Sequence, residues 1–126
     1  MLHHLSLGVR DLAVAGAFYD AALGALGYRR VFEDDTAIGY GLVDDEDQLC
    51  LKLRDDARAP GPGFHLAFSA ESRHAVQAFH RAALQCGGQD NGAAGLRPDY
   101  GDHYYAAFVI DPDGHRIEAV TKRVAA

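Results

Sequence analysis

The stretch FVIDPDGHRIEAV, residues 108–120, predicts two β-strands joined by a tight turn. Pro112 fixes φ near the value that the second turn position needs, and Gly114 takes the left-handed conformation that closes a short bulged loop. This turn sets the register of the hairpin by pairing Asp111 with His115. Because His115 follows the turn directly, we expect its side chain at the rim of the fold or outside it.

The same register places Glu118 opposite Phe108, so that the two side chains share one face of the sheet. Successive side chains along a strand point to opposite faces, and Glu118 therefore faces away from Ile117 and Ala119. A carboxylate that faces inward in the middle of a strand is costly unless it is paired or binds a metal ion. Glu118 is the first candidate for a functional residue.

Composition bounds the class of protein. The chain has 126 residues, 48% of them hydrophobic, which is enough to bury the core of one domain. The formal net charge of −6 and the scattered Lys and Arg residues argue against nucleic acid as a partner. No signal peptide and no membrane-spanning apolar run is visible, so we expect a soluble, cytoplasmic protein without a membrane partner. Cys50 and Cys86 have no CxxC spacing and indicate free thiols.

The opening pattern of the chain returns at a constant offset, which indicates an internal duplication. This offset pairs His4 with His65, Leu5 with Leu66, Asp11 with Ser72, Phe18 with Phe79 and Gly27 with Gly88. Each copy begins with an alternating strand and continues with an Ala-rich helix, which we expect to be capped by Asp11 in the first copy and by Ser72 in the second. We predict an α+β fold of two βαβββ modules in tandem, with helices on the outer face of a concave mixed sheet. One domain spans residues 1–126: module 1 over about 1–54, a linker over 55–63 and module 2 over about 64–122.

Residues 91–103 read as a long loop with Gly and Pro, and long loops of this kind are often functional. We expect a mobile lid here. The pattern does not identify a catalytic residue, but the residues around the end of this loop supply three candidates: His103, Tyr104 and Tyr105.

The two repeated histidines lie on the strand face opposite the leucines, as does the carboxylate of Glu118. His4, His65 and Glu118 therefore form a 2-His-1-carboxylate set that can hold a divalent ion such as Fe, Mn, Ni or Zn. A single strand histidine is more often a half-buried or surface residue, but its repetition at equivalent positions favours a metal site. Candidate substrate-binding residues on the same face are Ser6, Lys52, Phe108 and Arg116.

Three stretches resemble the vicinal oxygen chelate superfamily, which includes glyoxalases, fosfomycin-modifying enzymes, extradiol dioxygenases and bleomycin-resistance proteins. They are HLSLGVRDL at 4–12, FHLAF at 64–68 and DPDGHRIE at 111–118. The resemblance implies paired βαβββ modules and a homodimer whose metal sites draw on both subunits. His4 would then come from one chain, and His65 and Glu118 from the other.

The resemblance leaves the activity open, since one scaffold hosts many chemistries. Glyoxalases carry a second Glu ligand where this chain offers Cys50 or Lys52, so the fourth ligand position falls to Cys50, Lys52 or water. Ser6 matches a hydroxyl residue of fosfomycin-modifying enzymes, whereas Phe108 replaces their tyrosine. One hypothesis is a glyoxalase-like, metal-dependent lyase or isomerase, thiol transferase or dioxygenase acting on a small substrate with vicinal oxygens. The alternative is a metal-free small-molecule binding protein of the bleomycin-resistance type.

Overall fold

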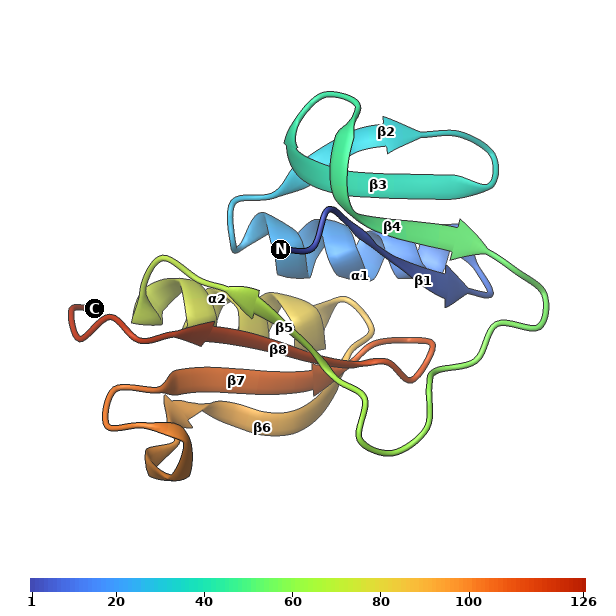
Figure 1. Cartoon of the computed structure of the whole chain (residues 1–126). Helices are drawn as coiled ribbons and strands as arrows, with labels where there is room; N and C mark the ends of the chain where they lie inside the picture. The colour runs from blue at the N-terminus through green and yellow to red at the C-terminus, as the bar shows by residue number, and fades with distance from the viewer.

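Two βαβββ modules follow one another along the chain (Figure 1), in a computed structural model that describes residues 1–126. Module 1 consists of β1 (Leu5–Val9), α1 (Leu12–Gly24), β2 (Arg29–Glu33), β3 (Ala37–Val43) and β4 (Glu46–Leu53). Module 2 consists of β5 (Leu66–Ser69), α2 (Arg73–Gln85), β6 (Gln89–Leu96), the short 3-10 helix η1 (Pro98–Tyr100), β7 (Tyr105–Ile110) and β8 (Arg116–Thr121). The predicted α+β fold with tandem modules is confirmed. No helix has the length and hydrophobicity needed to cross a membrane.

Each module forms its own four-stranded mixed sheet, in the orders β1-β4-β3-β2 and β5-β8-β7-β6. β1 runs parallel to β4 and β5 runs parallel to β8, while the other neighbours are antiparallel. The duplication extends to the register, because Ser6 pairs with Cys50 in module 1 as Ala67 pairs with Glu118 in module 2. Cys50 therefore occupies the position in module 1 that Glu118 occupies in module 2.

Both helices are capped by the residues that the sequence predicts, Asp11 and Ser72. The Asp11 side chain accepts a hydrogen bond from the Val14 N–H at 3.1 Å, and the Ser72 hydroxyl accepts one from the Ala75 N–H at 3.1 Å. Each cap satisfies one of the N–H groups that the first helical turn leaves without a partner. The equivalence of the two modules therefore includes the local structure at the start of each helix.

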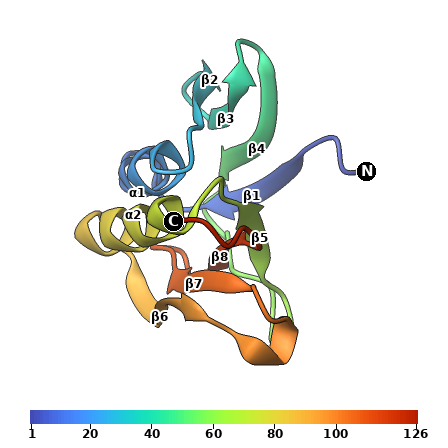
Figure 2. The ribbon, with the colours of Figure 1, turned by 90° about the vertical axis from the view of Figure 1, so that its left-hand side faces the viewer.

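Both helices lie together on one side of the molecule, and the two sheets diverge from them (Figure 2). The apolar faces of helices and sheets form a single core that spans both modules. Phe18 of α1 and Phe79 of α2, equivalent in the repeat, are both completely buried in it. Truncation of such a residue to Ala typically costs about 3–5 kcal/mol. The face of each sheet opposite the helices is left for a functional site.

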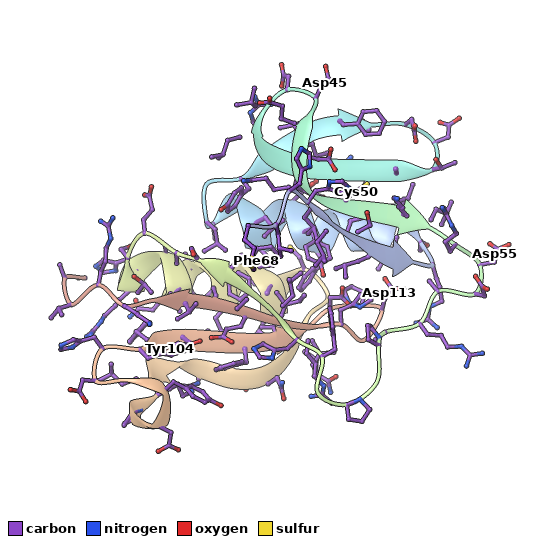
Figure 3. The ribbon with its side chains drawn as sticks, viewed as in Figure 1. Asp45, Cys50, Asp55, Phe68, Tyr104 and Asp113 are labelled. Carbon is purple, nitrogen blue, oxygen red and sulfur yellow. The ribbon has the colours of Figure 1, made fainter.

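The β7–β8 turn docks onto module 1. The Tyr19 hydroxyl donates a hydrogen bond to Asp111 Oδ2 at 2.6 Å, and His115 Nε2 donates to the Gly8 carbonyl at 2.9 Å. Asp113 lies between the two modules (Figure 3) and accepts a hydrogen bond from the Arg10 N–H at 3.0 Å. These contacts fix the orientation of the modules.

The expectation for His115 was wrong, because its side chain is 2% exposed. The hairpin register itself is confirmed, since the Asp111 N–H donates to the His115 carbonyl at 2.9 Å. The turn of a hairpin is exposed to solvent when no other segment packs against it. Here the end of β1 covers it, and this packing depends on the other module rather than on the local sequence.

The expectation of a long loop over 91–103 was wrong for its first half, because residues up to Leu96 belong to β6. The pairing of β6 with β7 shifts register between Asp90 and Gly92 and again between Gly92 and Gly95. Gly has a low strand propensity and often marks such irregularities. An edge strand with two glycines and two irregularities shows no period-2 pattern and resembles a loop in the sequence.

Candidate metal centre

Glu118 is a buried carboxylate in the middle of β8, with only 1% of the residue exposed. Its neighbours Ile117 and Ala119 pack in the core beneath the helices. The observed register pairs Glu118 with Phe108 on β7 and with Ala67 on β5, which confirms the predicted hairpin register. Burial of a carboxylate is costly without compensating hydrogen bonds, so the groups that contact it matter.

Two side chains satisfy the two oxygens of Glu118. His65 Nε2 lies 3.0 Å from Oε1, and the Tyr104 hydroxyl donates a hydrogen bond to Oε2. Because a carboxylate only accepts, the His65 nitrogen that faces it carries a proton. The His65 side chain is 53% exposed, so the cluster opens to solvent on the imidazole side. Glu118 and His65, two predicted ligands, are therefore in contact.

Tyr104 keeps its proton beside this carboxylate. Burial and the hydrogen bond to Glu118 raise the pKa of Tyr104 to about 12. The phenol therefore remains a hydrogen-bond donor at neutral pH, and it also packs edge to face against Tyr100, with ring centroids 5.3 Å apart. Of the three predicted catalytic candidates, Tyr104 alone contacts Glu118.

The other two catalytic candidates lie elsewhere. The Tyr105 side chain faces α2, where its hydroxyl accepts a hydrogen bond from Gln77 Nε2 at 2.8 Å and its ring lies 5.0 Å from the Arg73 guanidinium. Side chains alternate along β7, so Tyr105 lies on the face opposite Phe108. His103 is exposed in the turn before β7 and forms no side-chain hydrogen bond.

His4, the third predicted ligand, lies on module 1. It directly precedes β1, is exposed, and places its Nδ1 2.8 Å from Nδ1 of His3. It lines a hollow of about 390 Å³ between the modules, together with Leu5, Leu23, Leu49, Leu66 and Phe68. No group of three His, Cys, Asp or Glu side chains within the chain is arranged to hold a metal ion.

The predicted substrate-binding residues divide between the modules. Phe108 and Arg116 line an open hollow of about 360 Å³ together with His65, Asn91 and Tyr100. Ser6 and Lys52 lie on β1 and β4 of module 1, and both are exposed. The structure therefore brings Phe108 and Arg116 close to His65, and leaves Ser6 and Lys52 on the other module.

Cys50 is buried at the position equivalent to Glu118, and Figure 3 shows it on the opposite module from Tyr104. Burial, followed by the negative charge of Asp47, raises the pKa of the Cys50 thiol. A thiol with a raised pKa stays protonated, and a metal ligand must be the thiolate. Binding of a metal ion by Cys50 would therefore require release of the thiol proton.

One residue beside the site was missed by the sequence analysis. The Arg97 guanidinium lies over the Phe108 ring, 5.2 Å from its centroid. Arg97 follows the end of β6, which the sequence analysis interpreted as part of a loop. The signal available in the sequence was the pair of glycines at positions 92 and 95, since they leave space beside the strand.

Comparison with known proteins assigns the chain to a family. Residues 1–119 match the family model described as Glyoxalase/Bleomycin resistance protein/Dioxygenase superfamily. The structure is similar to that of a glyoxalase/bleomycin resistance protein from Albidiferax ferrireducens T118, with 31% identity, a TM-score of 0.80, and coverage of 94% of this chain and 95% of the other. It is also similar to a putative glyoxalase from Bacillus halodurans, with 29% identity, a TM-score of 0.68, and coverage of 95% and 94%.

A more distant similarity concerns the fold alone. The V278E mutant of glyoxalase I from Zea mays has 22% identity and a TM-score of 0.70, with 94% of this chain and 45% of that chain covered. No protein of curated function matches the sequence. The family match over nearly the whole chain agrees with the tandem modules and with the stretches that suggested the resemblance. The chain belongs to the glyoxalase/bleomycin resistance protein/dioxygenase superfamily.

Proposed function

We propose that the chain is the subunit of a homodimeric, metal-dependent enzyme. His65 and Glu118 of one subunit and His4 of the other would hold a divalent ion such as Fe, Mn, Ni or Zn. The observation that carries the proposal is the contact between His65 Nε2 and the buried Glu118 Oε1 at 3.0 Å. It places an imidazole nitrogen next to a carboxylate oxygen, the two donor types that these ions share.

His65 and Glu118 would both bind the ion directly, through the nitrogen and oxygen atoms that a hydrogen bond now joins. The proton between His65 and Glu118 would be displaced when the ion binds, which makes binding dependent on pH. Tyr104 would hold the carboxylate in place through its hydrogen bond to Oε2.

The position of His4, the third predicted ligand, is the reason for proposing a homodimer. His4 is exposed and belongs to module 1, whereas His65 and Glu118 lie together on module 2. A site shared between two subunits gives His65 and Glu118 a second imidazole without any rearrangement of the core. Cys50, Lys52 or water would fill a fourth position.

The ligand atoms indicate only the class of reaction. When bound, a divalent ion in such a site stabilises negative charge that develops on the oxygens of a small substrate which chelates it. The candidate reactions are those of a lyase or isomerase, a thiol transferase and a dioxygenase. Tyr104, protonated at neutral pH, holds a proton within reach of the site and orients Glu118. Phe108 and Arg116 would contact the substrate in the hollow beside His65.

A metal-free binding protein of the bleomycin-resistance type is the second candidate. The hollow of about 390 Å³ between the modules favours it, since most of its lining is apolar and it opens beside His4. Pockets of this size and character commonly bind small organic molecules.

Metal content separates the two candidates. Elemental analysis of protein purified without a histidine tag should find about one divalent ion per chain. The variants His65→Ala and Glu118→Ala should lose it, whereas His74→Ala, which removes an exposed histidine of α2, should retain it. Protein that binds none of the four ions, even after incubation with each of them, would favour the binding protein instead.

A further inference from the structure

Two arginines lie beside the candidate metal centre without a carboxylate partner. Arg97 places its guanidinium over the Phe108 ring, 5.2 Å from the centroid, and Arg116 lines the hollow that contains His65 and Phe108. Neither of them forms an ion pair with Asp or Glu. A guanidinium without a partner is suited to bind a carboxylate or phosphate group through two parallel hydrogen bonds.

The end of β6 is shaped to hold the Arg97 guanidinium. A Cβ at Gly92 would lie 3.2 Å from Arg97 Nη2, and a Cβ at Gly95 would lie 3.2 Å from Nη1. The guanidinium donates hydrogen bonds to the carbonyls of Ala93 at 2.7 Å and Leu96 at 3.4 Å. These contacts fix the group in place and leave further N–H donors free, so little conformational entropy is lost when an anion binds.

The strand register determines where both arginines lie relative to Glu118. Arg116 precedes Glu118 by two residues on β8, so both side chains lie on the same face, about 7 Å apart along the strand. Phe108 is directly opposite Glu118, and Arg97 lies over its ring. An anion held by the arginines would therefore lie a few bonds away from oxygens held at the metal centre.

We infer that the substrate carries an anionic group, a carboxylate or a phosphate, which Arg97 and Arg116 bind across Phe108, in addition to the vicinal oxygens at its other end. The inference rests on the proposed function, because it uses His65 and Glu118 to place the other end of the molecule. It assigns a role to Arg97 and to Arg116.

A matched pair of ligands tests the charge preference. The probes are 2-oxoglutarate and 2-oxopentanoate, which have the same five-carbon chain and the same vicinal oxygens and differ in a distal carboxylate or methyl group. Isothermal titration calorimetry of the metal-loaded protein should show 2-oxoglutarate binding at least about tenfold more tightly, as charge-assisted hydrogen bonds predict. Arg116→Met and Arg97→Met should each reduce this preference several-fold. Arg81→Met, which removes an exposed arginine of α2, should leave it unchanged.

Two further measurements distinguish the failure of the anion subsite from the failure of the metal site. Arg116 is exposed, so its replacement tests the role of charge even if Arg97→Met fails to fold. Titration of the metal-free protein with the same probes measures how tightly the arginines bind them without the contribution of a metal ion. A preference that persists without metal, and that metal does not strengthen, supports the anion subsite and contradicts the metal site. Equal affinity for the two probes, undetectable binding of both at millimolar concentration, or a preference that survives in Arg116→Met overturns the subsite.

Discussion

His65 Nε2 and Glu118 Oε1 lie 3.0 Å apart although 53 positions separate the two residues in the chain. The parallel pairing of β5 with β8 creates this contact, because it places Ala67 next to Glu118 and so brings the residue before β5 to the same face. The same pairing in module 1 places Ser6 beside Cys50. The duplicated scaffold thus presents two equivalent positions, and only module 2 carries a carboxylate at its copy.

Tyr104 should determine how tightly the centre holds a metal ion. Tyr104→Phe removes the donor to Glu118 Oε2, and loss of such a supporting hydrogen bond typically weakens metal affinity 10–100-fold. We expect a decrease of about tenfold or more in a titration with Zn or Mn. Tyr100→Phe, which alters the neighbouring exposed ring without touching Glu118, serves as the control. Equal affinity in all three proteins would show that Glu118 needs no support from Tyr104.

Tyr19 should stabilise the docking of the two modules. Its buried hydroxyl donates to Asp111 Oδ2 at 2.6 Å. Tyr19→Phe removes this donor from a buried carboxylate and should lower the free energy of unfolding by about 1–3 kcal/mol. Urea denaturation measures the change, and Tyr28→Phe, which removes a hydroxyl without a hydrogen-bond partner in the chain, should change the stability far less. A loss in Tyr19→Phe no larger than in Tyr28→Phe would contradict the role of this contact.

Tyr40 should make the protein less stable at alkaline pH. Burial, followed by the hydrogen bond to Asp20, raises the pKa of Tyr40 above its ordinary value of 10.0. The folded chain therefore keeps a proton that the unfolded chain releases above pH 10, so the free energy of unfolding falls as the pH rises through this range. The contribution of one tyrosine is about 1.4 kcal/mol per pH unit. Denaturation of Tyr40→Phe between pH 10 and 11 should show a shallower decline than the parent protein, and an unchanged slope would refute the assignment.

Gly95 should be required for the position of Arg97. A Cβ there would lie 3.2 Å from Arg97 Nη1, while the backbone of Gly95 does not need the left-handed conformation. Gly95→Ala should therefore displace the guanidinium and reduce the preference for 2-oxoglutarate over 2-oxopentanoate several-fold, with less effect on stability. Gly61→Ala, where an added Cβ meets nothing, is the control. The same preference in both variants would mean that Arg97 does not depend on this space.

The parts of the fold that depend on local chemistry could be predicted from the sequence. The turn residues Pro112 and Gly114 set the register that places Phe108 opposite Glu118, and the repeated caps predicted where both helices begin. These features follow from residues close together in the chain, and the duplication doubled the evidence for them.

The parts that depend on contacts between distant segments could not be predicted. The burial of His115 requires the end of β1, which belongs to the other module. The strand β6 lies at a sheet edge and carries glycines where a predictable strand would carry β-branched residues. The position of Arg97 depends on β6, so Arg97 could not be identified while β6 was interpreted as a loop. Tyr104 and Tyr105 were both candidates in the sequence, and their contacts with distant residues distinguish them, because Tyr104 contacts Glu118 whereas Tyr105 contacts Gln77 of α2.

The proposed metal site combines His4 of one subunit with His65 and Glu118 of the other. The direct test mixes His4→Ala with His65→Ala under refolding or co-expression and measures the metal content of the isolated heterodimer. Each variant alone should bind no metal, whereas the heterodimer should regain one intact site and bind about one ion. Heterodimers that stay as free of metal as either parent would contradict a site shared between the subunits.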